Sequence, residues 1–370
     1  MTRAPFAVWI EFHKTVASSE HPRRHPRLHF WNRYNTSNYA TGTLMNSRTD
    51  WQQELASCIK DPSVLLEKLN LRDSLNLTHL PREFSCRVPH SFFLKMKKGD
   101  INDPLLKQVL PLNEENTITP GYSLDPLQEL QANPTRGLLH KYAGRVLMTL
   151  TGACAIHCRY CFRRHFPYNN NSFAPSRWQM QLDYLKVNPD VHEVILSGGD
   201  PLTMKDSVLQ RIINDINHVE NVTTLRLHTR LPLVIPSRIT DGLCEMLKQS
   251  RLRVVMVIHC NHANEIDSVV EGFLQRLQQS GVTLLNQSVI LKGINDDAEA
   301  LTQLSLALHR VGVLPYYLHL PDKTQGTAHF DVTEAHAVDC IQAMRQRLPG
   351  YLVPRLAVEV PGDGAKTVIA

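Results

Sequence analysis

The chain has 370 residues, a hydrophobic fraction of 42% and a formal net charge of +5. This length allows one large domain or two modest ones, and no window is apolar for the length of a membrane span. Residues 1–44 hold six Lys/Arg and two Glu, so the remainder carries only about +1 and shows no basic footprint for nucleic acid.

Residues 1–44 are predicted to be a disordered leader, or the product of a start codon assigned too far upstream. In the second case the protein begins at Met45. The segment lacks the long apolar stretch of a secretory signal, because Glu11 interrupts the only candidate. A transit peptide for an organelle is the alternative, since the leader is rich in arginine and poor in acidic residues.

Residues 45–135 are predicted to form a helical N-terminal region. The periodicity indicates short helices over 51–58, 62–69, 89–98 and 104–110. Asp61-Pro62 and Asp103-Pro104 each place an acidic N-cap before a proline at the first helical position.

From Arg145 the pattern changes to strands that alternate with helices, which predicts an α/β fold over residues 136–370. Strands are expected over 146–150, 193–196, 224–228, 253–258, 283–291, 314–320 and 357–360. Helices are expected over 177–188, 208–218, 240–249, 265–279, 297–310 and 333–347. Six strand–helix units indicate a partial (β/α)6 parallel barrel. Its site should lie at the C-terminal ends of the strands, where the polar and glycine motifs fall.

Three cysteines, Cys154, Cys158 and Cys161, form a C-x3-C-x2-C run directly after the first barrel strand. Three thiolates so close together can hold three irons of a cubic cluster and leave the fourth iron open, whereas ferredoxins use four cysteines. The alternative is zinc, with His157 or His165 as the fourth ligand. Structural zinc sites, however, usually pair ligands from two knuckles. A cluster and free thiols both suit a reducing cytoplasm, where we expect the protein to act.

Tyr160, just before the third cysteine, completes a pattern that resembles the radical S-adenosylmethionine (SAM) enzymes. In that superfamily, the amino and carboxylate groups of SAM chelate the open iron. The glycine-rich segment after the second strand resembles the one that meets the amino group of SAM, because glycine lets backbone approach a ligand closely. Its residues are Ser197, Gly198, Gly199 and Asp200.

From about residue 47 to its end, the chain resembles the lysine 2,3-aminomutases. The segments that carry this resemblance are 140–145, 154–165, 197–202, 260–266, 285–296 and 361–366. The resemblance implies an isomerase that converts L-lysine into (R)-β-lysine by a 2,3-amino migration. It also implies three cofactors, namely a [4Fe-4S] cluster, SAM and pyridoxal 5'-phosphate (PLP).

The resemblance further implies roles for single residues. Lys366 lies on a glycine-rich loop and would be the catalytic lysine that binds PLP, since lysine amines form Schiff bases. Arg163 would bind the α-carboxylate of the substrate with its planar fork, and Asp322 with Glu359 would bind the distal ammonium. The residues implied to hold PLP and its phosphate are Lys141, Tyr142 and Arg145. Weaker candidates beside SAM are His259 and Gln287.

Three departures from the clostridial members point to a subgroup. Glu359 replaces an Asp, Lys141 replaces an Arg, and the zinc-binding cysteines beyond Lys366 are missing. These features resemble bacterial enzymes whose β-lysine is attached by a ligase to a lysine of elongation factor P. We therefore expect L-lysine, that ligase and an external one-electron reductant such as flavodoxin as partners, but no nucleic acid and no membrane. The alternatives are an aminomutase of lysine catabolism, a PLP-independent radical SAM enzyme, and a non-catalytic iron–sulfur or zinc module.

Overall fold

The computed structural model describes residues 51–370, apart from residues 73, 75–78 and 82. The chain divides into a unit Met1–Ser47 and a unit Arg48–Ala370, and the description below concerns the second. The leader expected over residues 1–44 lies outside the described residues. Among the described residues, no helix is both long and apolar enough to cross a membrane.

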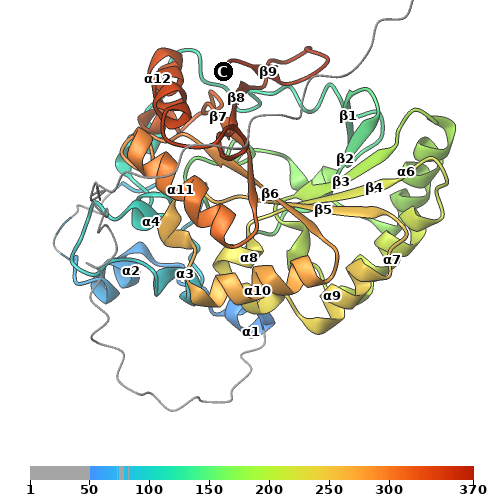
Figure 1. The fold of residues 1–370 in the computed structure, drawn as a ribbon, viewed down its shortest axis with the longest axis horizontal. Helices are drawn as coiled ribbons and strands as arrows, with labels where there is room; N and C mark the ends of the chain where they lie inside the picture. The colour runs from blue at the N-terminus through green and yellow to red at the C-terminus, as the bar shows by residue number, and fades with distance from the viewer. Residues whose placement is uncertain (1–50, 73, 75–78, 82) are drawn as a thin grey trace, which may run out of the picture. The chain divides into compact units, whose positions relative to one another are not determined.

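One sheet of nine strands runs in sequence order from β1 to β9, so the sheet is open at both ends. At one edge β1 (Leu138–Tyr142) pairs with β2 in antiparallel fashion, and at the other edge β9 (Thr367–Val368) pairs with β8 in the same way. The strands between them are all parallel (Figure 1); they are β2 (Arg145–Thr151), β3 (Glu193–Gly198), β4 (Thr224–Thr229), β5 (Arg253–Ile258), β6 (Thr283–Val289), β7 (Leu314–His319) and β8 (Arg355–Val358). The expected partial barrel is confirmed.

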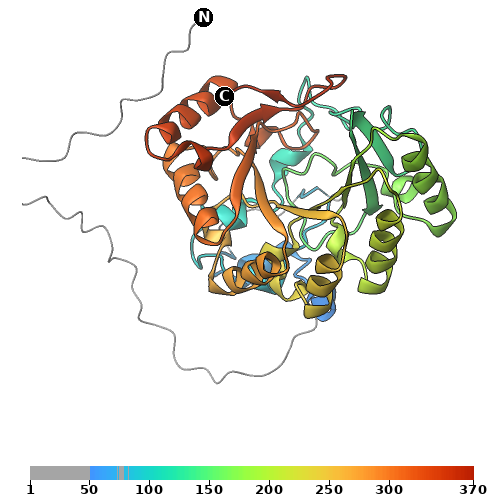
Figure 2. The same cartoon turned by 45° about the vertical axis from the view of Figure 1, so that its right-hand side comes forward.

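Six helices follow successive strands and cover the outer face of the curved sheet (Figure 2). They are α6 (Pro175–Val187), α7 (Asp206–Asn217), α9 (Asp241–Lys248), α10 (Ser268–Gln279), α11 (Ala298–Arg310) and α12 (Glu334–Arg345). Two shorter helices are α5 (Tyr168–Asn171) and α8 (Leu231–Val234). The sequence favours these helices because polar N-caps start several of them; for example, Asp267 accepts a bond from the Val270 amide. Their apolar stripes then pack on the sheet.

The N-terminal region contains α1 (Trp51–Ala56), α2 (Pro62–Lys68), α3 (His90–Phe93) and α4 (Pro104–Lys107). The predicted caps are confirmed, since Asp61 and Asp103 accept backbone bonds at the starts of α2 and α4. α3 is shorter than the expected helix over 89–98. The amide of Lys97 donates to the Asp103 carboxylate at 3.0 Å, and this bond turns the chain toward α4.

The two faces of the sheet differ in polarity. On β4, Leu225 and Leu227 are buried beneath the helices, whereas Arg226 and His228 are only half-buried. Alternate side chains of a strand point to opposite faces, so Arg226 and His228 face the interior of the barrel. The interior is thus polar and partly open, and the apolar core lies between sheet and helices.

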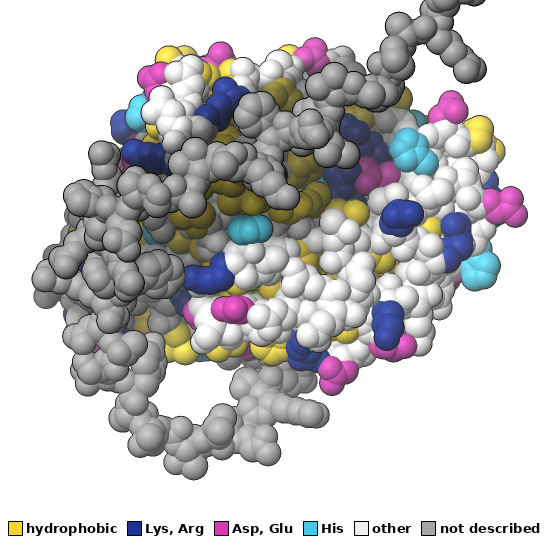
Figure 3. Space-filling model, in the orientation of Figure 1, with side chains coloured by type: hydrophobic (Ala, Val, Ile, Leu, Met, Phe, Trp, Pro, Cys, Tyr) yellow, Lys and Arg dark blue, Asp and Glu magenta, His cyan; other side chains and the backbone are white. Residues whose placement is uncertain are grey.

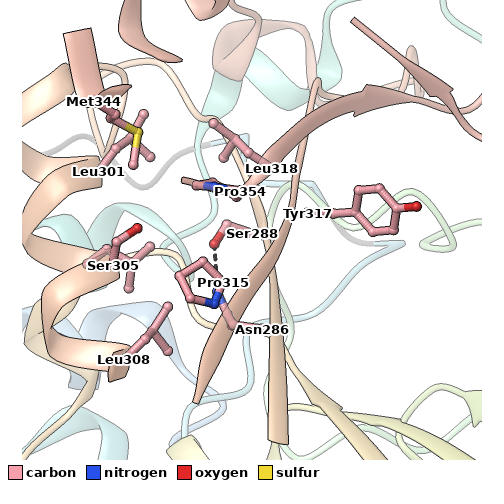
Figure 4. Close-up of a pocket in the computed structure, with 11 residues that line it drawn as sticks. Asn286, Ser288, Leu301, Ser305, Leu308, Pro315, Tyr317, Leu318, Met344 and Pro354 are labelled. Carbon is pink, nitrogen blue, oxygen red and sulfur yellow. Dashed lines mark hydrogen bonds between the residues drawn. The ribbon is translucent and has the colours of Figure 1, made fainter. Parts of the chain in front are cut away.

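The helix side of the sheet leaves room for no ligand at β6. Asn286 and Ser288 point toward α11, where they line a small cavity and bond to each other at 2.8 Å (Figure 4). The cavity has a volume of about 10 Å³, which is enough for about one water molecule. The ring of Tyr317 points away from it (Figure 4). This cavity is therefore too small for a substrate, and the interior face of the sheet is the side where a substrate can bind.

Candidate active site

The loop that carries Cys154, Cys158 and Cys161 leaves the C-terminal end of β2, and all three thiols are half-buried. Burial raises the pKa of Cys161 to about 11, and the neighbouring Cys158 adds to this. Burial, followed by the charge of Cys161, also raises the pKa of Cys154 well above its usual value. Such thiols become thiolates when a metal replaces their protons.

The loop is braced from the N-terminal region. Arg159 donates from Nε and Nη2 to the two carboxylate oxygens of Glu115, at 2.8 and 2.5 Å, and Arg164 donates to the same carboxylate at 2.6 Å. Glu115 lies in a short 3-10 helix, η1 (Asn113–Asn116). The side chains of Arg159 and Glu115 are both completely buried. The position of the cysteines therefore depends on residues outside the barrel.

The glycine-rich segment packs against the start of the cysteine loop. The amide of Gly199 donates to the carbonyl of Thr151 at 2.6 Å. Gly198 has a φ of +124°, and a Cβ added there would lie 2.5 Å from the Thr151 oxygen. A Cβ on Gly199 would lie 2.5 Å from the oxygen of Ala153. We expected these glycines to make room for a cofactor; in the structure they make room for the backbone of the cysteine loop, and their contact with a cofactor stays a prediction.

Asp200, the last residue of that segment, ties two strand ends together. Its buried carboxylate accepts bonds from the Thr229 hydroxyl at 2.8 Å, the Arg230 amide at 2.8 Å and the Leu202 amide at 3.0 Å. Burial raises its pKa to about 6 in spite of these bonds. The side chain is thus engaged within the protein, and its predicted contact with SAM stays a prediction.

Three polar side chains from neighbouring strands meet inside the barrel. Nε2 of Gln287 lies 3.1 Å from Nε2 of His259, and the His259 ring lies 5.8 Å from the ring of His228. Burial, with Arg230 and Arg163 nearby, lowers the pKa of His259 to about 3, so its imidazole is neutral. Nε2 of His228 is buried without a hydrogen-bond partner among the described residues. Such orphan atoms are rare and suit a ligand. In the sequence, His228 stands among the polar motifs at the strand ends, but no role was predicted for it.

A chain of charged groups runs from Lys366 across the interior. Nζ of Lys366 lies 2.6 Å from Oε2 of Glu359, whose Oε1 accepts from Lys141 at 2.8 Å. Burial opposes the charge of Glu359, but Lys366 and Lys141 together lower its pKa to about 2. Lys141 on β1, Glu359 after β8 and Lys366 before β9 are therefore brought together, as their predicted roles require.

The chain continues from Lys141 to Glu129, 3.7 Å away. Glu129 accepts from Nε and Nη2 of Arg163, both at 2.7 Å, and Nη1 of Arg163 donates to Ser197 at 3.1 Å. Glu129 is buried and was missed in the sequence, because a Glu in a proline-bounded connection carries no motif. On the face shown in Figure 3, hydrophobic side chains lie in a hollow with basic and acidic side chains at its edge.

Asp322 has a carboxylate without a hydrogen-bond partner in the described part of the chain. Burial, then the negative charge of Glu359, raises its pKa to about 7. Nearby, the guanidinium of Arg145 lies 4.6 Å from the ring centre of Tyr142. The pKa of Tyr142 is raised by burial and by Glu359. Asp322, Tyr142, Lys141 and Lys366 thus all lie within electrostatic reach of Glu359.

Comparison with known proteins gives this arrangement a family. Residues 148–304 match the Radical SAM superfamily. The L-lysine 2,3-aminomutase of Haemophilus influenzae is 46% identical over 88% of this chain and 97% of its own length, and that of Escherichia coli is 46% identical over 87% and 94%. The chain belongs to the L-lysine 2,3-aminomutase family. The L-lysine 2,3-aminomutase of Clostridium subterminale is 37% identical over 86% of this chain and 77% of its own length.

Membership in the L-lysine 2,3-aminomutase family makes the protein an isomerase and implies a [4Fe-4S] cluster, SAM and PLP. The residues fit the cluster. In the described chain, no three His, Cys, Asp or Glu side chains are grouped around a point where one metal ion could sit. Cys154, Cys158 and Cys161 would each hold one iron of that cluster. Membership in a family of isomerases argues against the non-catalytic alternative.

The residues also fit the organic cofactors of an aminomutase. PLP needs an amine, and Lys366 reaches the interior from the loop before β9. It also needs cations for its phosphate, which Lys141 and Arg145 can supply beside Tyr142. The orphan Nε2 of His228 shows that the same interior has a polar atom free for a ligand.

Proposed function

We propose that this protein is a PLP-dependent radical SAM aminomutase that converts L-lysine into (R)-β-lysine. One observation carries the proposal: the interior holds a guanidinium, Arg163, joined to Glu359 by the charged chain through Glu129 and Lys141, and a half-buried carboxylate, Asp322, that lies within electrostatic reach of Glu359. A diamino acid has the matching groups, a carboxylate at one end and a second ammonium at the other.

The residues of this chain would bind and orient the substrate. Arg163 has donors left on Nη1 and Nη2 for a carboxylate, and Asp322 offers oxygens to the distal ammonium. Glu359 now holds Lys366, and it would turn to the distal ammonium once Lys366 is engaged elsewhere. The barrel would hold these groups in a fixed orientation toward the substrate.

The cofactors would supply what side chains cannot. When bound, the cluster with SAM supplies a carbon radical that takes a hydrogen from the substrate, and PLP supplies a conjugated carbonyl partner for the migrating amino group. The cluster would be held by Cys154, Cys158 and Cys161, and PLP by Lys366. The segment Ser197–Asp200, with His259 and Gln287, would contact SAM.

The experiment is anaerobic incubation of cluster-loaded protein with L-lysine, SAM and a one-electron reductant such as flavodoxin, with and without PLP. Chiral analysis should find (R)-β-lysine only when PLP is present. Formation of no β-lysine would reject the proposal. Equal formation without PLP would favour the PLP-independent alternative.

The PLP lysine has its own test. Borohydride reduction of the PLP-loaded protein, followed by peptide mass spectrometry, should place the label on Lys366. Lys323 is a matched control, because it is an exposed lysine beside Asp322 that pairs with Asp331. Label on Lys323 or on any other lysine would reject the assignment of Lys366.

We further infer that the product passes to a β-lysine ligase that modifies elongation factor P. The support is the subgroup resemblance, in which Glu359 and Lys141 replace the Asp and Arg of clostridial members. In a reconstituted mixture, elongation factor P should gain the mass of one β-lysyl group only when this protein, the ligase and lysine are all present. An unmodified factor would favour the catabolic alternative.

A further inference from the structure

Arg230 reaches the cysteine loop from the end of β4. Its side chain is 6% exposed, and its Nη1 lies 2.7 Å from Sγ of Cys158 and 2.9 Å from the hydroxyl of Tyr160. The Tyr160 hydroxyl also bonds to Cys158, and in the described chain no side-chain donor is found at the sulfur of Cys154 or Cys161. The contact is therefore specific to one of the three sulfurs.

The position of Arg230 is fixed by groups from separate elements. Its Nη2 donates to Oε1 of Gln108 at 2.6 Å and to Oε2 of Glu265 at 3.0 Å. Gln108 caps the C-terminus of α4, and Glu265 belongs to a 3-10 helix after β5, η4 (Ala263–Glu265). Both are completely buried. The backbone amide of Arg230 is held by Asp200 at 2.8 Å.

The charges around Arg230 become unequal once the cluster is bound. Glu265 balances the guanidinium when Cys158 is a neutral thiol, but a ligating Cys158 adds a second negative charge. A donor and a positive charge at a ligating sulfur favour the cluster state that carries the extra electron. Removing them therefore makes reduction harder, and the sign of this effect does not depend on the substrate.

We propose that Arg230 is a positioning residue that raises the reduction potential of the cluster through its bond to Cys158. The inference rests on the cluster that the proposed function requires, but on neither lysine nor PLP. It also gives the N-terminal region a role in the chemistry, because Gln108 helps to hold the guanidinium in place.

The test is a redox titration of the cluster-loaded protein, followed by electron paramagnetic resonance, without SAM, lysine or PLP. Arg230→Gln should lower the equilibrium constant for reduction by at least about ten-fold, which is 59 mV for a one-electron couple. Arg230→Lys keeps the positive charge, so its reduction potential should lie between those of the wild type and Arg230→Gln. Arg226→Gln is the matched control, since Arg226 binds Glu193 at the opposite end of the same strand, and its potential should equal that of the wild type.

A second variant separates tuning from folding. Arg230→Gln leaves Glu265 buried without its cation, so Arg230→Gln/Glu265→Gln removes both charges. The double variant should regain thermal stability while its potential stays low. Wild-type potentials in both variants would overturn the inference, as would loss of the cluster from every Arg230 variant, because Arg230 would then only hold the loop. A wild-type protein that binds no reducible cluster would reject the proposed function as well.

Discussion

Two carboxylate–arginine pairs hold the cysteine loop, one on each side. Glu115 binds Arg159 on the side of the N-terminal region, and Glu129 binds Arg163 on the side of the barrel interior. Each arginine uses Nε and Nη2 to bind both carboxylate oxygens, which is the strongest form of this contact. The local chemistry of the two pairs is therefore the same.

Their surroundings differ. Nη1 of Arg159 donates to the carbonyls of Phe84 and Ser85, and both members of that pair are fully buried. Arg163 donates to Ser197 and keeps one N–H on Nη1 and one on Nη2 without a partner in the described chain. The first pair is closed and can only stabilise. The second is open to a ligand, so the same pair of residue types gains a function from its place beside the interior.

The largest effect should be a loss of stability when the buried Glu115–Arg159 pair is broken. Glu115→Gln leaves Arg159 and Arg164 buried without a counter-charge, and breaking a buried pair in this way costs about 3–5 kcal/mol. Denaturant unfolding should show this loss of stability. The KM for lysine of the protein that stays folded should be unchanged, and a raised KM would contradict the purely structural role of Glu115.

Arg163→Lys should have the next largest effect, and on activity rather than stability. A lysine has no planar fork, so it cannot bind Glu129 and a substrate carboxylate with fixed geometry. We expect kcat/KM for lysine to fall about 100-fold, because a small misplacement of the reacting groups can cost a factor of this size. The paired measurement is the midpoint of thermal unfolding, which should move much less than in Glu115→Gln. A stable variant with wild-type kcat/KM would contradict the predicted role of Arg163.

Glu129→Gln should lower kcat/KM about ten-fold, because Arg163 keeps its charge but loses the carboxylate that fixes its fork. Glu193→Gln is a matched control. Glu193 also binds an arginine through both oxygens, but it does so at the start of β3, four residues before Ser197. Equal losses in the two variants would mean that Glu129 matters only for stability.

The barrel was predictable because its information is local. Each strand from β2 to β8 lies within a few residues of its predicted range, since buried apolar runs and polar caps mark the elements. β1 and β9 were missed for the opposite reason. Each is an edge strand; β9 has only two residues, both exposed, and β1 buries only its first two leucines before three half-buried residues, so neither shows a regular apolar pattern. Their pairing is imposed by the neighbouring strand.

The site was predictable only where a motif carried it. The cysteine run, the glycines and Lys366 have characteristic spacing. Glu129, His228 and Arg230 do not, because their importance arises from contacts across more than 30 residues of sequence, such as Glu129 with Arg163. The sequence thus named candidate ligands for the cofactors, but it did not name the residues that hold those candidates in place.

The smallest effect should be a pH dependence confined to the open side. Burial and then Glu359 raise the pKa of Asp322 to about 7, so in the free protein its carboxyl is largely protonated below that value. The protonated form stabilises the fold at low pH, and this contribution is lost as pH rises through about 7. Binding of the distal ammonium has the opposite sign, since it needs the carboxylate.

The KM for lysine should therefore rise several-fold as pH falls from about 8 to about 6. Asp322→Asn cannot ionise, so its KM should be high at both pH values. Asp331→Asn is the control, because Asp331 is an aspartate that pairs with Lys323 and Tyr122 away from Arg163, and it should keep the wild-type pH profile. A pH-dependent KM that survives in Asp322→Asn would assign the titration to another group of the charged chain. Glu359 could then no longer be treated as the partner of Asp322 in binding the distal ammonium.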